Sequence, residues 1–275
     1  MKLVQKLTQK CFKHRKIDTI VFDVAGTICD KYSRAPFVAL TQTFLEDFQI
    51  RLTNDVVRKP TGNDKMIHIQ AILSNKSVSE QWTQNHGNKP NLDNAKKIFE
   101  KYEIRQIELL KSLEFTKMLP KTLSTLNFMQ TKYDLKYGIT TGYNDKMMVE
   151  VLNSLKTQGF VPDSCFASNE IKRPRPYPDG ILANLAKLKR YQENCIKIGD
   201  TPIDMQEANN SGCISLGIVK YGNKMGELLP DVSEKQALKL ARQQLVNAGA
   251  DFVIDEITEL EEVIKFIYYE STSRF

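Results

Sequence analysis

The chain has 275 residues, of which 41% are hydrophobic and 26% charged, and its formal net charge is +6. These values are typical of a soluble globular protein with one large domain, or with a core and a smaller insert. The basic excess is mild and no arginine-rich run follows residue 16, so we expect a small anionic substrate and no nucleic-acid partner. No stretch approaches the roughly 20 apolar residues that cross a bilayer, which argues against a membrane segment.

The N-terminal segment 1–16 contains six basic residues and no acidic one. Two interpretations stay open for it, a solvated extension before the domain or an organellar targeting peptide. The five cysteines are isolated, odd in number and without a CxxC pair. This pattern argues against a disulfide framework and a structural zinc site, and it predicts a reducing, cytoplasmic compartment.

The predicted elements alternate between strands and helices along the chain. A short apolar run predicts the first strand, and helical periodicity follows over a long stretch. Further strands come later, and the helices between them are expected to begin after the capping residues Asn144, Thr201 and Ser233. The strands are expected at 20–22, 135–140, 196–198, 214–219 and 252–254, and the long helical stretch at 36–116. Such alternation predicts an α/β fold with a doubly wound parallel sheet.

The helical stretch interrupts the strand–helix alternation and therefore predicts a separate unit. We expect a core domain made of 17–35 and 117–275, and an inserted α-helical cap domain made of 36–116. The basic extension 1–16 precedes both.

Two of the predicted strands end in an acidic residue. Asp23 follows the first strand and precedes Gly26, which lets the backbone approach a ligand closely. Asp200 follows the strand at 196–198, and Asp204 comes one helical turn later. Ligands of open α/β sheets bind beyond the carboxyl ends of the strands. Either motif alone could be a turn or a helix cap, but together they predict an oxygen-rich site suited to Mg²⁺.

Two further motifs suit an anionic ligand. Thr141, Gly142 and Tyr143 follow the strand at 135–140, where a hydroxyl and backbone N–H groups can bind a phosphoryl group. Arg175 lies between two prolines, which position it to bind anionic oxygens. Each motif by itself could equally be a structural loop.

In this order and combination, the four motifs resemble those of the haloacid dehalogenase superfamily of aspartyl-nucleophile hydrolases, although Arg175 stands where many members have lysine. The resemblance implies a Rossmann-like core and a covalent aspartyl-phosphate on Asp23. It also implies a Mg²⁺ ion that is bound by Asp23, by Asp200 and by the backbone carbonyl of Ala25. Asp204 would lie next to these ligands without binding the ion itself.

One position departs from the superfamily pattern. Ordinary phosphatases and mutases of the superfamily have an aspartate two residues after the nucleophile as general acid, and this chain has Ala25 there. The leaving group therefore needs a different activator. The predicted cap offers one, because 58–68 is typical of a turn that opens a helix, with Lys65 in the first helical turn. There the helix dipole opposes an ammonium group, and His68 lies on the same helix face for proton transfer.

The alanine, the cap turn 59–65 with its following histidine, and the runs 140–143 and 175–178 resemble the phosphonoacetaldehyde hydrolase (phosphonatase) family. This resemblance implies that Lys65 forms a Schiff base with an aldehyde while Asp23 attacks phosphorus. The phosphorus–carbon bond would then break to give acetaldehyde and phosphate.

The same resemblance implies the remaining roles. Thr141 and Arg175, with Gly142 and Tyr143, would hold the phosphonate, and His68 would shuttle protons. The family pattern also implies a homodimer that forms through the cap helices.

Three alternatives stay open or are disfavoured. Asp64 precedes Lys65 and would favour its ammonium form, which leaves room for a phosphonatase-like phosphatase that acts on another small phosphoryl substrate without imine chemistry. A catalytically silent binding protein with the same fold is the second alternative. A 2-haloacid dehalogenase is disfavoured, because those enzymes work without Mg²⁺ and need no pair of acids after the fourth motif.

Overall fold

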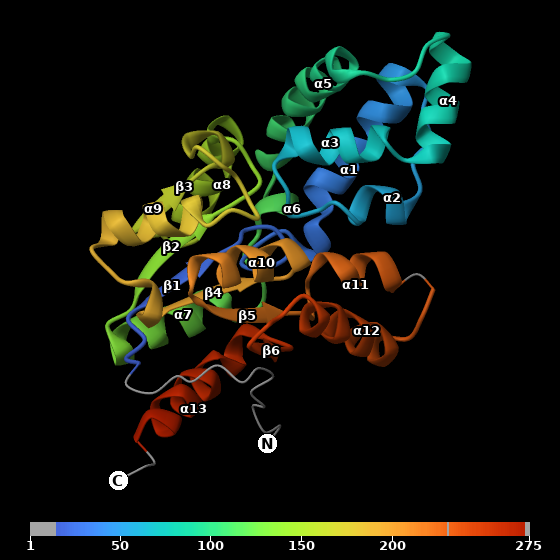
Figure 1. Ribbon diagram of the computed structural model, residues 1–275. Coiled ribbons are helices and arrows are strands. Elements are labelled where there is room, and N and C mark those ends of the chain that lie inside the picture. The colour runs from blue at the N-terminus through green and yellow to red at the C-terminus, as the bar shows by residue number, and fades with distance from the viewer. Residues whose placement is uncertain (1–14, 230, 273–275) are drawn as a thin grey trace.

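A six-stranded parallel sheet forms the centre of the computed structural model, which describes residues 15–229 and 231–272 (Figure 1). The strand order is β3-β2-β1-β4-β5-β6. The strands are β1 (Thr19–Phe22), β2 (Lys136–Thr140), β3 (Ser164–Phe166), β4 (Cys195–Gly199), β5 (Ile214–Ile218) and β6 (Phe252–Ile254). The predicted α/β class is confirmed, and the expected basic extension 1–16 lies almost entirely outside the described residues.

Helices cover both faces of the sheet, and the side chains of β1 explain why. All four residues of β1 are buried, and successive residues of a strand point to opposite faces. Ile20 and Phe22 belong to the large apolar cluster that includes α7, α8 and α13, whereas Val21 packs in a separate cluster with α9. The core helices are α7 (Thr122–Tyr133), α8 (Asp145–Thr157), α9 (Asp179–Leu188), α10 (Pro202–Ser211), α11 (Asn223–Leu228), α12 (Glu234–Asn247) and α13 (Leu260–Thr272).

The helix ends agree with their sequence signals. Asn144, Thr201 and Ser233 each accept a hydrogen bond from a backbone N–H in the first turn of the helix that follows. The two elements at 164–166 and 179–188 are absent from the expected pattern. The first is a three-residue edge strand, too short for a visible alternation, and the second follows a proline-rich loop.

A block of helices, called the cap from here on, lies between β1 and α7 and stands together beyond the sheet in Figure 1. The cap helices are α1 (Arg34–Gln42), α2 (Asn54–Arg58), α3 (Lys65–Leu73), α4 (Lys76–His86), α5 (Leu92–Leu110) and α6 (Leu113–Thr116). Apolar cap residues such as Phe44, Ile69 and Ile98 share one continuous cluster with β1. The cap is therefore packed onto the core rather than held apart from it.

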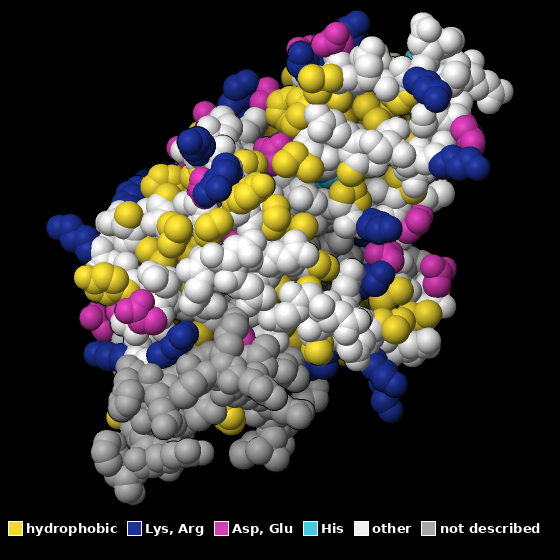
Figure 2. All heavy atoms as spheres, in the orientation of Figure 1, with side chains coloured by type: hydrophobic (Ala, Val, Ile, Leu, Met, Phe, Trp, Pro, Cys, Tyr) yellow, Lys and Arg dark blue, Asp and Glu magenta, His cyan; other side chains and the backbone are white. Residues whose placement is uncertain are grey.

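The surface of the described residues has two further features. None of the helices within 15–229 and 231–272 combines the length and the apolar character that a membrane crossing requires. On the face shown in Figure 2, Lys and Arg side chains are interspersed with Asp and Glu side chains instead of forming one continuous basic surface.

Candidate active site

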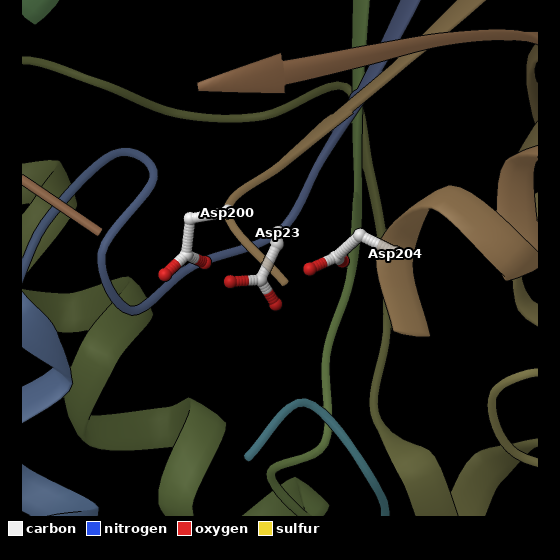
Figure 3. Close-up of side chains that lie close together, drawn as sticks. All are labelled: Asp23, Asp200 and Asp204. Carbon is white, nitrogen blue, oxygen red and sulfur yellow. The ribbon is translucent and has the colours of Figure 1, made fainter. Parts of the chain in front are cut away.

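The ends of neighbouring strands bring the predicted acidic residues together. β1 lies between β2 and β4 in the sheet, so Asp23, which follows β1, is beside the residues that follow the other two strands. Asp200 follows β4, and Asp204 lies in the first turn of α10. Each of the three side chains offers an oxygen within 4.8 Å of the other two, and Figure 3 shows the three carboxylates gathered at one place.

Asp200 is buried and, within the described part of the chain, hydrogen-bonds only to neutral donors. Its Oδ1 accepts from the Thr27 hydroxyl at 3.3 Å and its Oδ2 accepts from the backbone N–H of Asn223 at 2.6 Å. Burial, followed by repulsion from Asp23 and Asp204, raises the pKa of Asp200 well above its usual range. A carboxylate in these surroundings is stabilised in its charged form by a bound cation.

Asp23, in contrast, has a cation at contact distance. Arg175 Nη1 donates to Asp23 Oδ1 at 2.7 Å and lies 2.9 Å from Asp204 Oδ1, while Nη2 donates to the carbonyl and the hydroxyl of Thr140. Burial and the charge of Asp204 raise the pKa of Asp23, against the attraction of Arg175 and Lys197. Arg175 thus orients the carboxylate of Asp23, and its expected contact with a phosphonate stays a prediction.

A buried network of charged side chains surrounds Arg175, the partner of Asp23, and two of its members do not belong to the predicted sequence motifs. Glu207, in α10, lies 2.9 Å from Arg175 Nε and accepts from the Thr140 hydroxyl at 3.0 Å. Lys197, in β4, donates to the same hydroxyl at 2.8 Å and lies 3.3 Å from Asp204 Oδ1. The sequence carries a signal for this network, because a lysine between two isoleucines of a buried strand requires partners.

The charges of this network fit a divalent cation. Four buried carboxylates face two buried cations, which leaves a formal excess of two negative charges. Mg²⁺ prefers carboxylate and carbonyl oxygens and would offset that excess. The carboxylates are those of Asp23, Asp200, Asp204 and Glu207, and the cations are Arg175 and Lys197.

The cap meets the core through a turn that leads into α3, called the cap turn (59–64) from here on. Gly62 has φ +100°, and a Cβ there would lie 2.5 Å from the Thr201 hydroxyl. A Cβ at Gly142 would lie 2.3 Å from the Asn63 carbonyl. Only glycine allows the backbone of the cap turn to approach the core this closely.

Lys65 is the first residue of α3, as expected, and it is 4% exposed. Its Nζ lies 5.3 Å from the centre of the Tyr143 ring. Burial lowers the pKa of Lys65 to about 8, against the opposing attraction of Asp23 and Asp64. Asp64 caps the N-terminus of α3, because its carboxylate accepts hydrogen bonds from the backbone N–H groups of Met66 and Ile67. The acid next to Lys65 therefore does not prevent a lowered pKa.

His68 lies one turn after Lys65 and is completely buried. Its Nε2 is 2.7 Å from the Val57 carbonyl, which can only accept a hydrogen bond, so Nε2 carries the proton. Nδ1 has no hydrogen-bond partner among the described residues and is left as an acceptor. Burial, with the charge of Lys65, lowers the pKa of His68 to about 3. A neutral imidazole with a free lone pair can accept a proton.

A small cavity of ≈ 20 Å³ lies between the cap turn and the strand ends. This is space for about one water molecule, so the cap turn has to move before a larger ligand can enter. The predicted residues that line the cavity are Asp23, Ala25, Lys65, Thr141, Gly142 and Tyr143. The structure therefore brings the proposed nucleophile and the cap lysine to one space, whereas Arg175, Asp200, Asp204 and His68 lie outside its lining.

Comparisons with known proteins bear on the family and the fold of the chain. A sequence model of the family described as haloacid dehalogenase-like hydrolase matches residues 20–218. The chain is 32% identical to the phosphonoacetaldehyde hydrolase of Parabacteroides distasonis over 92% of this chain and 97% of the relative, and 31% identical to that of Syntrophobacter fumaroxidans over 91% and 92%. The crystal structure of a phosphonoacetaldehyde hydrolase like protein from Oleispira antarctica superposes with a TM-score of 0.89 at 27% identity, over 98% of this chain and 99% of that one.

Proposed function

We propose that this chain, which belongs to the haloacid dehalogenase-like hydrolase family and, within it, to the phosphonatase family, hydrolyses the phosphorus–carbon bond of phosphonoacetaldehyde. The observation that carries the proposal is that Asp23 and Lys65 line the same cavity. A small molecule with a phosphonate at one end and an aldehyde at the other can meet both groups at once.

Lys65 begins the reaction in this proposal. With a pKa of about 8, roughly one lysine in ten is a neutral amine at pH 7, against about one in 3,000 for an ordinary lysine. The neutral amine adds to the aldehyde carbon to give a carbinolamine, which loses water to give an imine. One proton taken up from solvent then protonates the imine nitrogen. The free Nδ1 of His68 would take a proton from the adding amine through a water molecule and return it to the carbinolamine oxygen, which leaves as water.

Asp23 then attacks phosphorus, and the phosphorus–carbon bond breaks. The electron pair of that bond moves into the protonated imine, which becomes a neutral enamine. No general acid is needed at position 25, because the leaving group is a carbon that the imine has already activated. This accounts for Ala25 in place of the usual aspartate.

Water completes the cycle at both centres. One water hydrolyses the aspartyl-phosphate to phosphate, and protonation of the enamine carbon followed by a second water releases acetaldehyde and free Lys65. Since imine formation released one water, the net reaction consumes a single water. Arg175 keeps the carboxylate of Asp23 oriented, and Thr141 and Gly142 face the phosphonate from the core side of the cavity.

We propose Mg²⁺ as the cation of the site, held by Asp23, Asp200 and the Ala25 carbonyl. Asp200 lacks a cationic hydrogen-bond partner in the described residues, and the surrounding network carries a formal excess of negative charge. When bound, Mg²⁺ would offset the charge of the phosphonate and of Asp23 so that the two can approach.

The test separates imine chemistry from phosphoryl chemistry. Borohydride added with phosphonoacetaldehyde should reduce the imine to a stable adduct on Lys65, located by mass spectrometry, and Lys65→Arg should form no adduct and release no phosphate. Asp23→Asn should still form the adduct but lose phosphate release by about 10⁴-fold, because the nucleophile is gone.

The opposite results identify the alternative. Turnover of phosphonoacetaldehyde by Lys65→Arg would exclude the imine route. Phosphate release from other phosphoryl compounds that depends on Asp23 and not on Lys65 would make the protein a phosphatase of the same family.

A further inference from the structure

Arg58, the last residue of α2, joins the cap to the core and takes no part in the chemistry described above. It is 5% exposed. Its Nη1 donates to the Tyr32 carbonyl at 2.6 Å and to the Asn223 side-chain oxygen at 2.9 Å, and its Nε donates to Asn54 at 2.8 Å. The guanidinium also lies 4.5 Å from the centre of the Phe37 ring. One cap arginine therefore contacts the segment before α1 and the first residue of α11.

Asn223 both donates a hydrogen bond to Arg58 and accepts hydrogen bonds from it. Its side-chain N–H donates to the Arg58 carbonyl at 3.1 Å, while its own Oδ1 and backbone carbonyl accept from Arg58 Nη1 at 2.9 and 3.3 Å. A Cβ at Gly226 would lie 2.9 Å from Arg58 Cζ, so the core leaves room for the guanidinium only because this residue is glycine. The position of Asn223 is thus set by the docked cap.

The same Asn223 also holds the proposed metal ligand. Its backbone N–H donates to Asp200 Oδ2 at 2.6 Å, and Asp200 has only one other hydrogen-bond donor among the described residues, the Thr27 hydroxyl at 3.3 Å. The path from the cap to the site is therefore short: Arg58, Asn223, Asp200. In the other direction along the chain, Arg58 is followed directly by the cap turn, which lines the cavity and precedes Lys65.

We propose that Arg58 and Asn223 are positioning residues that couple docking of the cap to cation binding at Asp200. When the cap turn lifts to admit a ligand, Arg58 leaves Asn223, and the N–H that orients Asp200 loses its support. Cation binding at a well-oriented Asp200 in turn favours the docked cap, because a coupling between two equilibria acts equally in both directions. The enzyme would then hold its metal most tightly while the cavity is closed around the substrate. This inference rests on the Mg²⁺ site of the proposed function.

The test measures Mg²⁺ binding without any turnover. In the full-length chain, Asn223→Ala keeps the backbone N–H but removes the side-chain contacts, and Arg58→Met removes the guanidinium and keeps an apolar stem. Isothermal titration with MgCl₂ should give about tenfold weaker binding for each variant. The double variant should bind no more weakly than the weaker single variant, because both remove one link.

A second measurement follows the cap itself. Hydrogen exchange of the cap turn should slow when Mg²⁺ is added to the unchanged protein, and this protection should be lost in both variants. Arg105→Met is the matched control: Arg105 pairs with Glu46 and Asp47 inside the cap, so its loss should leave both readouts unchanged. Unfolding curves of each variant verify that it is folded.

The outcomes distinguish this inference from the proposed function. Folded variants that bind Mg²⁺ as tightly as the unchanged protein would overturn the coupling and leave Arg58 as a structural contact. An unchanged protein that binds no Mg²⁺ would overturn the metal site and the coupling with it. Phosphonoacetaldehyde turnover of the unchanged protein tests the proposed reaction independently of both.

Discussion

The carboxyl edge of the sheet and the cap turn face each other across the cavity, and they are built on opposite electrostatic principles. At the sheet edge, three buried carboxylates, those of Asp23, Asp204 and Glu207, contact two buried cations at 2.7 to 3.4 Å. In the cap, Lys65 is just as buried, but its Nζ faces an aromatic ring, and no ion pair to it is found among the described residues. The sheet edge therefore concentrates charged groups, whereas burial in the cap lowers the pKa of one amine.

In the proposed reaction, this difference corresponds to a division of the chemistry between the two regions. Phosphoryl transfer needs fixed charges around the phosphorus, which the strand ends provide. Imine formation needs an uncharged amine, and burial without an ion-pair partner lowers the pKa of Lys65 to about 8. Three changes test whether the two regions act in these separate ways.

The largest effect is expected at the sheet edge. Glu207→Gln removes a buried charge that lies 2.9 Å from Arg175 Nε and 3.4 Å from Lys197 Nζ, so each of these buried cations loses one ion-pair partner. The free energy of unfolding should fall by about 3 kcal/mol, measured by urea denaturation. Glu108→Gln breaks the exposed pair with Lys111 and should change that free energy by less than about 0.5 kcal/mol. Equal effects would mean that the buried network contributes no more than a surface ion pair.

A smaller effect is expected where the two regions touch. Gly62→Ala places a Cβ 2.5 Å from the Thr201 hydroxyl and should hold the cap turn away from the core, lowering kcat/KM by roughly 10- to 100-fold. Gly87→Ala is the control, because Gly87 also has a positive φ, +79°, but a Cβ there meets nothing within 4 Å. Both variants carry backbone strain, so a similar loss of kcat/KM in both would contradict the close-approach explanation.

The smallest effect is expected at the cap lysine. Removing the charge in Asp64→Asn should lower the pKa of Lys65, because that carboxylate favours the ammonium form. The rise of kcat/KM with pH, which should follow deprotonation of Lys65 near pH 8, should therefore move to lower pH. Asparagine also caps helices well, so α3 should keep its N-terminal hydrogen bonds, whereas Asp64→Ala should cost about 1 kcal/mol of stability. A profile that stays in place or moves to higher pH would show that another group controls it.

Much of the core could be predicted from local patterns. The strand–helix alternation, the capping residues Asn144 and Thr201, and the acids after two strands follow from periodicity and from the chemistry of helix ends, which depend on nearest neighbours in the chain. The edge strand β3 could not be found in this way, because three residues carry no alternation. The strand is defined by its parallel backbone pairing with β2, a contact between distant parts of the chain.

The residues of the site also fall into those that local patterns predict and those that only contacts between distant residues bring together. Local sequence patterns are enough to predict that Asp23, Asp200 and Asp204 follow strands that end at one edge of a parallel sheet, and that a lysine opens a cap helix. Other contacts follow from the folded arrangement alone: Arg175 contacts Asp23, Glu207 and Lys197 complete the buried network, and Arg58 and Asn223 connect the cap to Asp200. The physical reason is distance along the chain: a carboxylate 152 residues from its arginine partner, or an arginine 165 residues from its asparagine, leaves no periodic trace in the sequence. Burial then decides the charge state of each group, and burial is a property of the folded protein.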